Sequence, residues 1–374
     1  MKMTILVMMS FFLILQSCGN RTKSSSEEIN APQTVLELNP SDDNPRNGEG
    51  DFITLTDGRI LFIYSHFTGG DDDHASAFLA GRFSDDGGIS WSDEDIEFFS
   101  NESGLNLMSV SLLKLDNGEI ALFYLRKDSL TDCRPILRIS NDEGKTWSEE
   151  ILCINDRIGY FVLNNDRVVQ LGSGRLIAPV SQHAGPDMEW TDFGRIRAYY
   201  SDDNGRTWEA GKEVANPDSM TLQEPGVIAL KDGRVMMFMR NNSGYQYISF
   251  SSDQGETWSP AEASNIRSPR SPATIERIPS TGDLLMVWNN NGGENKAIAG
   301  KRTPFNTAVS KDEGKTWQMI RTLADDPDGW YCYTAMEFTG DNVLLGHSAG
   351  NRKENNGLAV AHVSRLSLDW IYGK

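Results

Sequence analysis

The chain has 374 residues, of which 39% are hydrophobic and 24% charged, a balance typical of globular proteins. Its formal net charge of −18 at pH 7 gives a surface that repels DNA, RNA and anionic membranes, which argues against nucleic-acid partners. An anionic ligand would need local arginines to overcome this background field.

Residues 1–17 are predicted to be a signal peptide. One lysine precedes an apolar run from Thr4 to Leu15, which is short for a membrane span and matches a secretory signal. The ending "LQSC" resembles a bacterial lipobox, so we expect cleavage before Cys18 and lipidation of that cysteine; secretion with an incidental Cys18 is the alternative. Residues 18–32 have the composition of a flexible tether. The protein is therefore expected to be exported and lipid-anchored to a bacterial envelope membrane, in the periplasm or at the cell surface.

The remaining cysteines are Cys133, Cys153 and Cys332. No CxxC pair or Cys/His cluster is present, so neither a disulfide framework nor a zinc site is indicated. A lone disulfide stays open. We expect no metal and no other cofactor.

From residue 33 onward the sequence repeats one hairpin signal. It consists of alternating apolar residues, then a turn with Gly or Asn, then an apolar run. The signal occurs six times, at 52–65, 111–125, 167–180, 226–240, 273–288 and 335–348. No segment has a convincing helical period over a long window.

Five of the six units end in a box of the form S-x-D-x-G-x-[ST]-W or a close variant of it. The boxes are "SDDGGISW" at 84, "SNDEGKTW" at 140, "SDDNGRTW" at 201, "SSDQGETW" at 251 and "SKDEGKTW" at 310. Five copies of one motif indicate a structural element of a repeat fold rather than a catalytic motif, which is needed once. We expect the Ser and Asp to bond a tight turn, the Gly to allow positive φ, and the Trp to pack between strands.

Repeated four-stranded units of this kind predict an all-β fold, a six-bladed β-propeller formed by residues 33–374 as one domain. The sixth unit lacks the box. The strand "TVLELN" at 34–39 is therefore expected to close the ring as the outer strand of that last blade.

Five such boxes in a six-bladed pattern resemble the bacterial sialidase (neuraminidase) superfamily, whose boxes are known as Asp-boxes or BNR repeats. The resemblance covers nearly all of the chain after the signal peptide. It is specific for the fold and weak for the activity, because related propellers cleave other sugars or only bind them.

A catalytic pair is suggested by position. Glu224 lies nine residues before Gly233 of its turn, and Tyr333 lies nine residues before Asn342 of the corresponding turn. The two look like the sialidase pair, in which a tyrosine is the nucleophile and a glutamate takes its proton. A neutral phenol avoids the repulsion that a carboxylate nucleophile would meet from an anionic sugar. Tyr331 is an alternative nucleophile. The structural alternatives are a salt bridge at the rim for Glu224 and an ordinary strand aromatic for Tyr333.

The resemblance also implies an acid in the loop after the first hairpin, here "SHFTGGDDDHAS". Asp73 is the first choice for protonating the leaving oxygen. Asp72 and then Asp71 follow, and His74 is a lesser candidate. A solvated acidic loop is the alternative reading.

Family sialidases hold the substrate carboxylate with three arginines. Arg240 and Arg302 match two of these positions. The third departs from the pattern, because the family's Arg-Ile-Pro is absent and Glu49 stands near its place.

Arg46 and Arg270 are the candidate substitutes for the third arginine. Arg126 is a weaker one. A surface position is the alternative for each of them.

Three functions remain open at this point. The first is an exo-α-sialidase-like glycosidase that removes a terminal sialic acid or related acidic sugar from glycans with retention. The second is an enzyme of the same fold acting on another terminal sugar, which Glu49 and Asp51 near the axis would favour. The third is a non-catalytic glycan-binding lipoprotein. A glycan is the expected partner in each case, the lipid anchor is the only expected membrane contact, and the oligomeric state is left open.

Overall fold

The computed structural model describes residues 31–102 and 104–374. The predicted signal peptide, Cys18 and most of the tether lie outside these residues. Within the described part, no helix has the length and apolarity needed to cross a membrane.

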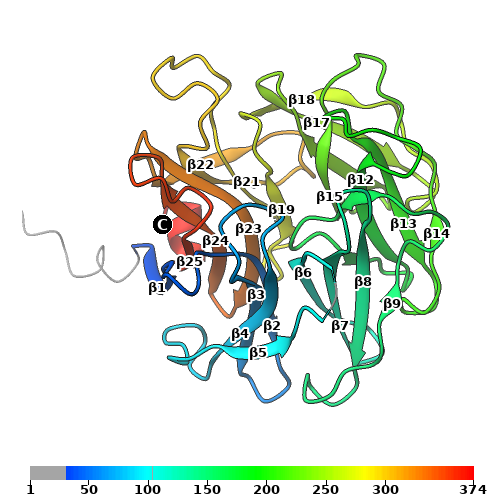
Figure 1. Cartoon of the computed structure of the whole chain (residues 1–374). Coiled ribbons are helices and arrows are strands. Elements are labelled where there is room, and N and C mark those ends of the chain that lie inside the picture. The colour runs from blue at the N-terminus through cyan, green and yellow to red at the C-terminus, as the bar shows by residue number, and fades with distance from the viewer. Residues whose placement is uncertain (1–30, 103) are drawn as a thin grey trace, which may run out of the picture.

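The described chain is almost entirely β-structure, and each of the six predicted hairpins is an antiparallel strand pair (Figure 1). The first sheet contains β2 (Arg46–Thr54), β3 (Ile60–Phe67), β4 (Ala77–Ser84) and β5 (Ile96–Phe99). The last sheet contains β23 (Gly329–Thr339), β24 (Asn342–Asn351), β25 (Ala361–Ser367) and β1 (Gln33–Leu38).

Between these two sheets the chain forms a nine-stranded sheet and two four-stranded sheets. The nine-stranded sheet contains β6 (Asn106–Lys114), β7 (Ile120–Lys127), β8 (Cys133–Ser140), β9 (Ile151–Leu152), β10 (Tyr160–Val162), β11 (Val169–Gln170), β12 (Leu176–Ala184), β13 (Arg195–Ser201) and β14 (Glu209–Ala210). The next sheet contains β15 (Gln223–Ala229), β16 (Val235–Arg240), β17 (Tyr245–Ser251) and β18 (Glu262–Arg267). It is followed by β19 (Thr274–Arg277), β20 (Leu284–Trp288), β21 (Phe305–Ser310) and β22 (Gln318–Ala324).

The nine-stranded sheet consists of two four-stranded groups, β6–β9 and β11–β14, which β10 joins by pairing with both β8 and β12. Apolar side chains are buried between successive sheets in a series of clusters. This is the architecture of a β-propeller, and the grouping is compatible with the predicted six blades.

The inner strands meet at the centre of the molecule. The Asn165 side-chain amide donates to the carbonyl of Gly50 at 2.9 Å and to that of Tyr333 at 3.1 Å. The Thr274 hydroxyl donates to the Thr334 carbonyl at 2.7 Å. Residues far apart in the sequence are therefore fixed around one axis.

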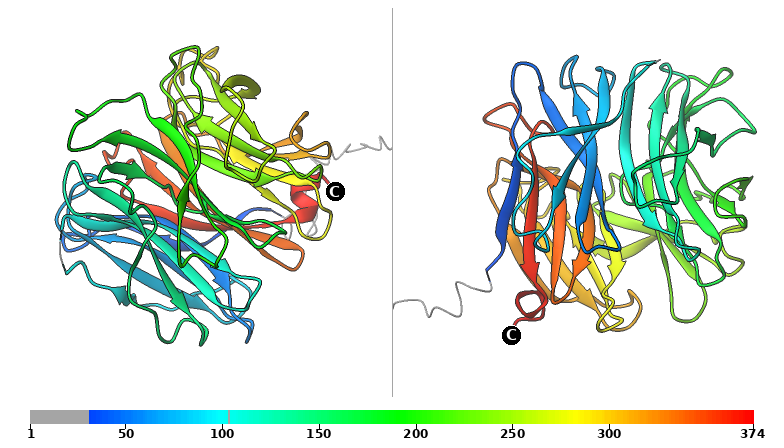
Figure 2. Two further views of the ribbon diagram at one scale, coloured as in Figure 1. Left: turned by 90° about the vertical axis from the view of Figure 1, so that its right-hand side faces the viewer. Right: turned by 90° about the horizontal axis from the view of Figure 1, so that it is seen from below.

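The ring closes where the two ends of the described chain meet. Strand β1 pairs antiparallel with β25, with Leu38 opposite Ala361, as the second view of Figure 2 shows for the blue and red strands. The prediction that residues 34–39 supply the outer strand of the last blade is confirmed by this pairing. A short helix, α2 (Leu368–Tyr372), follows β25.

The boxes act as turn elements, as predicted. In the fourth box the Asp253 carboxylate accepts from the Thr257 backbone N–H at 2.8 Å, from the Thr257 hydroxyl, and from the Ser251 hydroxyl at 2.8 Å. Gly255 has φ 95°, and its carbonyl accepts from the Trp258 indole at 3.1 Å. One carboxylate thus satisfies three donors of a tight turn.

Asp253→Ala is expected to lower the free energy of unfolding by about 1–2 kcal/mol, because three donors lose their acceptor at a partly exposed site. Denaturant titration would measure this. Asp43→Ala, at an exposed aspartate in the loop before β2, is the control and should change stability by less than about 0.5 kcal/mol. Equal losses in both variants would contradict the role of the box.

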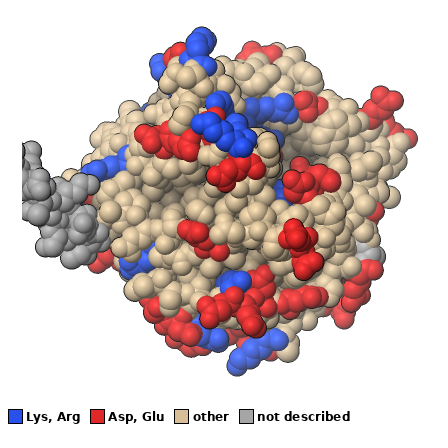
Figure 3. Space-filling view, turned by 60° about the vertical axis from the view of Figure 1, so that its left-hand side comes forward, with Lys and Arg blue, Asp and Glu red and all other residues tan. Residues whose placement is uncertain are grey.

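Acidic and basic side chains are interspersed over the face of the molecule in Figure 3, and acidic side chains gather along its lower edge. This mixed surface agrees with the net charge of −18.

Candidate active site

Four inner strands carry the same irregularity near the axis. Strands β2, β6, β15 and β23 each shift register against their hairpin partner at one point. At each shift stands a non-glycine residue with a left-handed backbone: Glu49 (φ 53°), Ser109 (φ 61°), Glu224 (φ 45°) and Tyr333 (φ 54°). Such strained residues concentrate at functional sites, and all four line one cavity.

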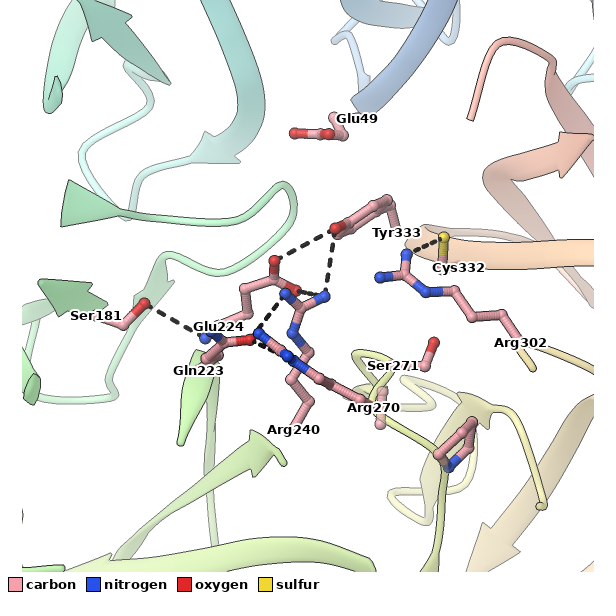
Figure 4. Close-up of polar contacts among 12 residues, drawn as sticks. Glu49, Ser181, Gln223, Glu224, Arg240, Arg270, Ser271, Arg302, Cys332 and Tyr333 are labelled. Atoms are coloured by element: carbon pink, nitrogen blue, oxygen red, sulfur yellow. Dashed lines mark hydrogen bonds and ion pairs between the residues drawn. The ribbon is translucent and has the colours of Figure 1, made fainter. Parts of the chain in front are cut away.

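Tyr333 and Glu224 are in contact, although they lie 109 residues apart. The Tyr333 hydroxyl donates to Glu224 Oε1 at 3.3 Å, and both side chains are less than a tenth exposed (Figure 4). The guanidinium of Arg240 lies 2.9 Å from Glu224 Oε2 and donates to the Tyr333 hydroxyl oxygen at 3.4 Å. The phenol, a carboxylate and a cation thus form one connected group.

Burial and the adjacent Glu224 carboxylate raise the pKa of Tyr333 above its usual value. The phenol is therefore neutral at ordinary pH, and it can become a nucleophile only as its proton leaves. Glu224 is the carboxylate within reach of that proton.

A second layer of contacts fixes Arg240 in place. Gln223 Oε1 accepts from Arg240 Nη2 at 3.0 Å and from Arg270 Nε at 3.0 Å. Arg270, which is 40% exposed, also pairs with Asp192 at 3.2 Å. Arg270 therefore lies at the same cavity as Arg240, as a substitute for the missing arginine would have to.

Arg302 approaches the phenol from the other side. Its Cζ lies 5.1 Å from the centre of the Tyr333 ring and 5.4 Å from that of Trp330. One of its nitrogens is 2.8 Å from the sulfur of Cys332, and Figure 4 shows the side chain directed toward Tyr333. The structure thus brings Tyr333, Arg302 and the pair Glu224 and Arg240 together from three sheets, although Arg302 is not among the residues that line the cavity.

Arg46 is not free to bind a substrate carboxylate, because its guanidinium is already paired. Its guanidinium is 2% exposed and lies between two carboxylates, 2.9 Å from Glu49 and 2.6 Å from Asp73. Burial opposes ionisation of Asp73, but the Arg46 charge prevails and lowers the pKa of that carboxyl. The ion pair with Arg46 therefore favours the ionised form of Asp73. Its side chain is 59% exposed.

The acidic loop is fixed at its backbone by buried side chains. Arg46 donates to the Asp71 carbonyl at 3.2 Å, Asn106 donates to the Asp73 carbonyl at 2.9 Å, and Lys127 donates to the same oxygen. These contacts hold Asp73 at the edge of the cavity.

The other three acidic-loop candidates, Asp71, Asp72 and His74, lie outside the cavity lining. Asp72 accepts from the His74 backbone N–H at 2.8 Å, and the His74 ring lies edge-on to Tyr160, with 6.5 Å between ring centres. Neither Asp72 nor His74 is among the residues that line the cavity.

Three predicted candidates lie elsewhere in the structure. Tyr331 stacks on Phe305, with 5.5 Å between ring centres, in the apolar packing between two sheets. Asp51 accepts two backbone N–H groups and faces a separate axial cavity. Arg126 pairs with Asp128 and Glu150 in an outer groove.

Several cavity residues were missed from the sequence. Trp190, which is 57% exposed, stacks on His183 at 5.2 Å and lies edge-on to Tyr160 at 5.1 Å, so the three form an aromatic wall. Ser109 could have been found, because it lies nine residues before Gly118, the same offset that locates Glu224 and Tyr333. The aromatic wall and Lys127 have no comparable signal.

Cys133, Cys153 and Cys332 are free and buried. In the described residues no group of three His, Cys, Asp or Glu side chains is arranged to hold a metal ion.

The comparisons agree with this architecture. Residues 62–345 match the model of the BNR repeat-like domain family. A sialidase from Micromonospora viridifaciens is 24% identical over 343 residues, which cover 82% of this chain and 51% of the relative. A sialidase from Paraclostridium sordellii is 26% identical over 286 residues, 68% of each chain. The leech intramolecular trans-sialidase superposes with a TM-score of 0.71 at 14% identity, covering 94% of this chain and 73% of that one.

The chain therefore belongs to the BNR repeat-like domain family. The resemblance to the bacterial sialidase superfamily and the predicted β-propeller class are both confirmed. The chain spans about half the length of the M. viridifaciens relative.

Proposed function

We propose that this protein is an exo-acting glycoside hydrolase of sialidase type, which removes a terminal acidic sugar from a glycan with net retention. The observation that carries the proposal is the contact of the Tyr333 hydroxyl with Glu224 at 3.3 Å, in a cavity that also presents Arg240. The sialidases among the relatives support the same class.

In the proposed first step the phenol oxygen of Tyr333 attacks the anomeric carbon while its proton passes to Glu224. The bond to the leaving oxygen breaks, and that oxygen takes a proton from Asp73, or from Asp72 or Asp71. Water then attacks the tyrosyl glycoside and gives a proton to the same aspartate. The Tyr333 oxygen leaves and recovers its proton from Glu224, so the enzyme is restored.

The arginines serve the carboxylate of the sugar in this proposal. Arg240 and Arg302 flank the phenol, and Arg270 lies beside Arg240 through Gln223. Arg46 is held by Glu49 and Asp73, so we assign it to fixing the acidic loop.

A release assay on sialylated, arabinosylated and uronic-acid glycans tests the proposal, with detection of the free monosaccharide. Release of an acidic sugar would support it. Release of a neutral sugar would favour the second candidate, an enzyme of the same fold with another substrate. The carboxylate of Glu49, which lines the cavity, supports that candidate. Binding without release would favour a glycan-binding protein.

We also propose that the protein is exported and lipid-anchored through Cys18. The support is the "LQSC" sequence after an apolar run. Cys18→Ser is expected to move the protein from the membrane fraction to the soluble fraction of the expressing cell. Unchanged membrane retention on fractionation would contradict the anchor.

A further inference from the structure

Glu49 is in the same structural position as the proposed catalytic pair. It lies at the register shift of β2, as Glu224 and Tyr333 lie at those of β15 and β23, and all three have positive φ. Figure 4 shows Glu49 across the open space from the phenol of Tyr333. A residue held in this conformation presents its side chain to the axial cavity, which Glu49 lines.

The carboxylate of Glu49 is fixed by two neighbours. Arg46 Nη2 lies 2.9 Å from Oε1, and the Ser109 hydroxyl donates to Oε2. Each oxygen retains a second lone pair, so both can accept a further hydrogen bond from a ligand. Glu49 is 7% exposed, which gives such a bond a largely water-free setting.

The two ends of the cavity differ in charge. At one end the carboxylates of Glu49 and Asp73 are balanced by two cations: Arg46, which pairs with both, and Lys127, which donates to the Asp73 carbonyl. At the other end Arg240 and Arg270 line the cavity beside the carboxylates of Glu224 and Asp192, and Arg302 adds a third cation against the Tyr333 ring. An anionic group is therefore attracted more strongly to the second end than to the first.

We propose that Glu49 determines specificity, by accepting hydrogen bonds from a hydroxyl group of the terminal sugar. The inference rests on the proposed glycosidase function. It narrows the substrate to a sugar whose carboxylate faces Arg240 and Arg302 and whose opposite side carries a free hydroxyl. Arg46 and Ser109 orient the Glu49 carboxylate for this contact.

The test uses Glu49→Gln, with Glu97→Gln on the exposed outer strand β5 as the matched control. The substrates are 4-methylumbelliferyl glycosides of N-acetylneuraminic acid, glucuronic acid and arabinose, and the monodeoxy analogues of the best one. Glu49→Gln is expected to lower kcat/KM about 10- to 100-fold, since a hydrogen bond to a charged group is lost. For the analogue that lacks the contacted hydroxyl, wild type and variant should differ less than about twofold. Circular dichroism and thermal melting establish that both variants are folded.

Two outcomes would overturn the proposal. One is an unchanged or higher kcat/KM of Glu49→Gln on an acidic sugar, which would mean that Arg46, once released, serves the carboxylate. The other is an equal loss on every deoxy analogue, which a purely structural role would produce.

If wild-type protein hydrolyses none of the three glycosides, the proposed function fails by itself. Calorimetry then measures the binding of the three free sugars to both variants and tests whether Glu49 contacts the sugar. Weaker binding by Glu49→Gln than by Glu97→Gln would support the inference, and equal, tighter or absent binding in both would overturn it.

Discussion

Tyr333→Phe is expected to lower kcat by about 10³-fold or more while leaving the protein folded. The change deletes only the hydroxyl, which is 3.3 Å from Glu224 and which is the proposed nucleophile. The ring keeps its packing beside Arg302 at 5.1 Å, so stability should change by no more than about 1 kcal/mol. Steady-state kinetics with the substrate identified by the release assay, together with a thermal melt, measure both effects.

Tyr331→Phe is the matched control for this experiment. It makes the same change two residues earlier on the same strand, at a ring that stacks on Phe305 outside the cavity. We expect near-normal turnover. Loss of activity in Tyr331→Phe with normal activity in Tyr333→Phe would reverse the assignment of the nucleophile.

Glu224→Gln is expected to lower kcat by about 10²- to 10⁴-fold, because the amide cannot take the phenol proton. The loss in kcat should exceed the effect on KM, since the side chain keeps its size and Arg240 still donates to Gln223 Oε1 at 3.0 Å.

Glu276→Gln provides the comparison for this variant. Glu276 is also an inner-strand glutamate, but it lies on β19 at the separate axial cavity, where burial and neighbouring carboxylates raise its pKa. A neutral amide is therefore tolerated there, and turnover should stay normal. Equal losses in the two variants would point to general disturbance of the axis rather than to base catalysis by Glu224.

The sequence was sufficient for the repeat architecture because each unit encodes its own turn chemistry. The Asp of a box satisfies donors of its own tight turn, and a Gly turn sets the register of each hairpin, so local motifs predicted the blades and the closing strand. The catalytic pair could be found for the same reason. The register shifts recur at a fixed distance from the turn, and counting from Gly233 and from Asn342 therefore reached Glu224 and Tyr333.

The electrostatics of the site could not be obtained in this way. Arg46 was a reasonable substitute for the missing arginine by its position in the sequence, but a sequence does not show that Glu49 and Asp73 share its guanidinium. Trp190, His183 and Tyr160 come from one loop and two strands that carry no repeated signal at these positions. Their side chains meet because β10 pairs with β12 and the loop after β12 places Trp190 against both rings.

The most direct test of the central claim is a mass measurement on the peptide that contains Tyr333. Wild-type protein is mixed with an aryl glycoside of the released sugar, whose good leaving group speeds the first step so that the second step limits the rate. The mixture is quenched with acid during turnover. The account predicts that this peptide gains the mass of one glycosyl residue on Tyr333, and that the gain is absent from Tyr333→Phe. The samples are taken while free sugar accumulates and while a burst of leaving group shows that the second step limits the rate. If the Tyr333 peptide is unmodified at every such time point, the account is contradicted.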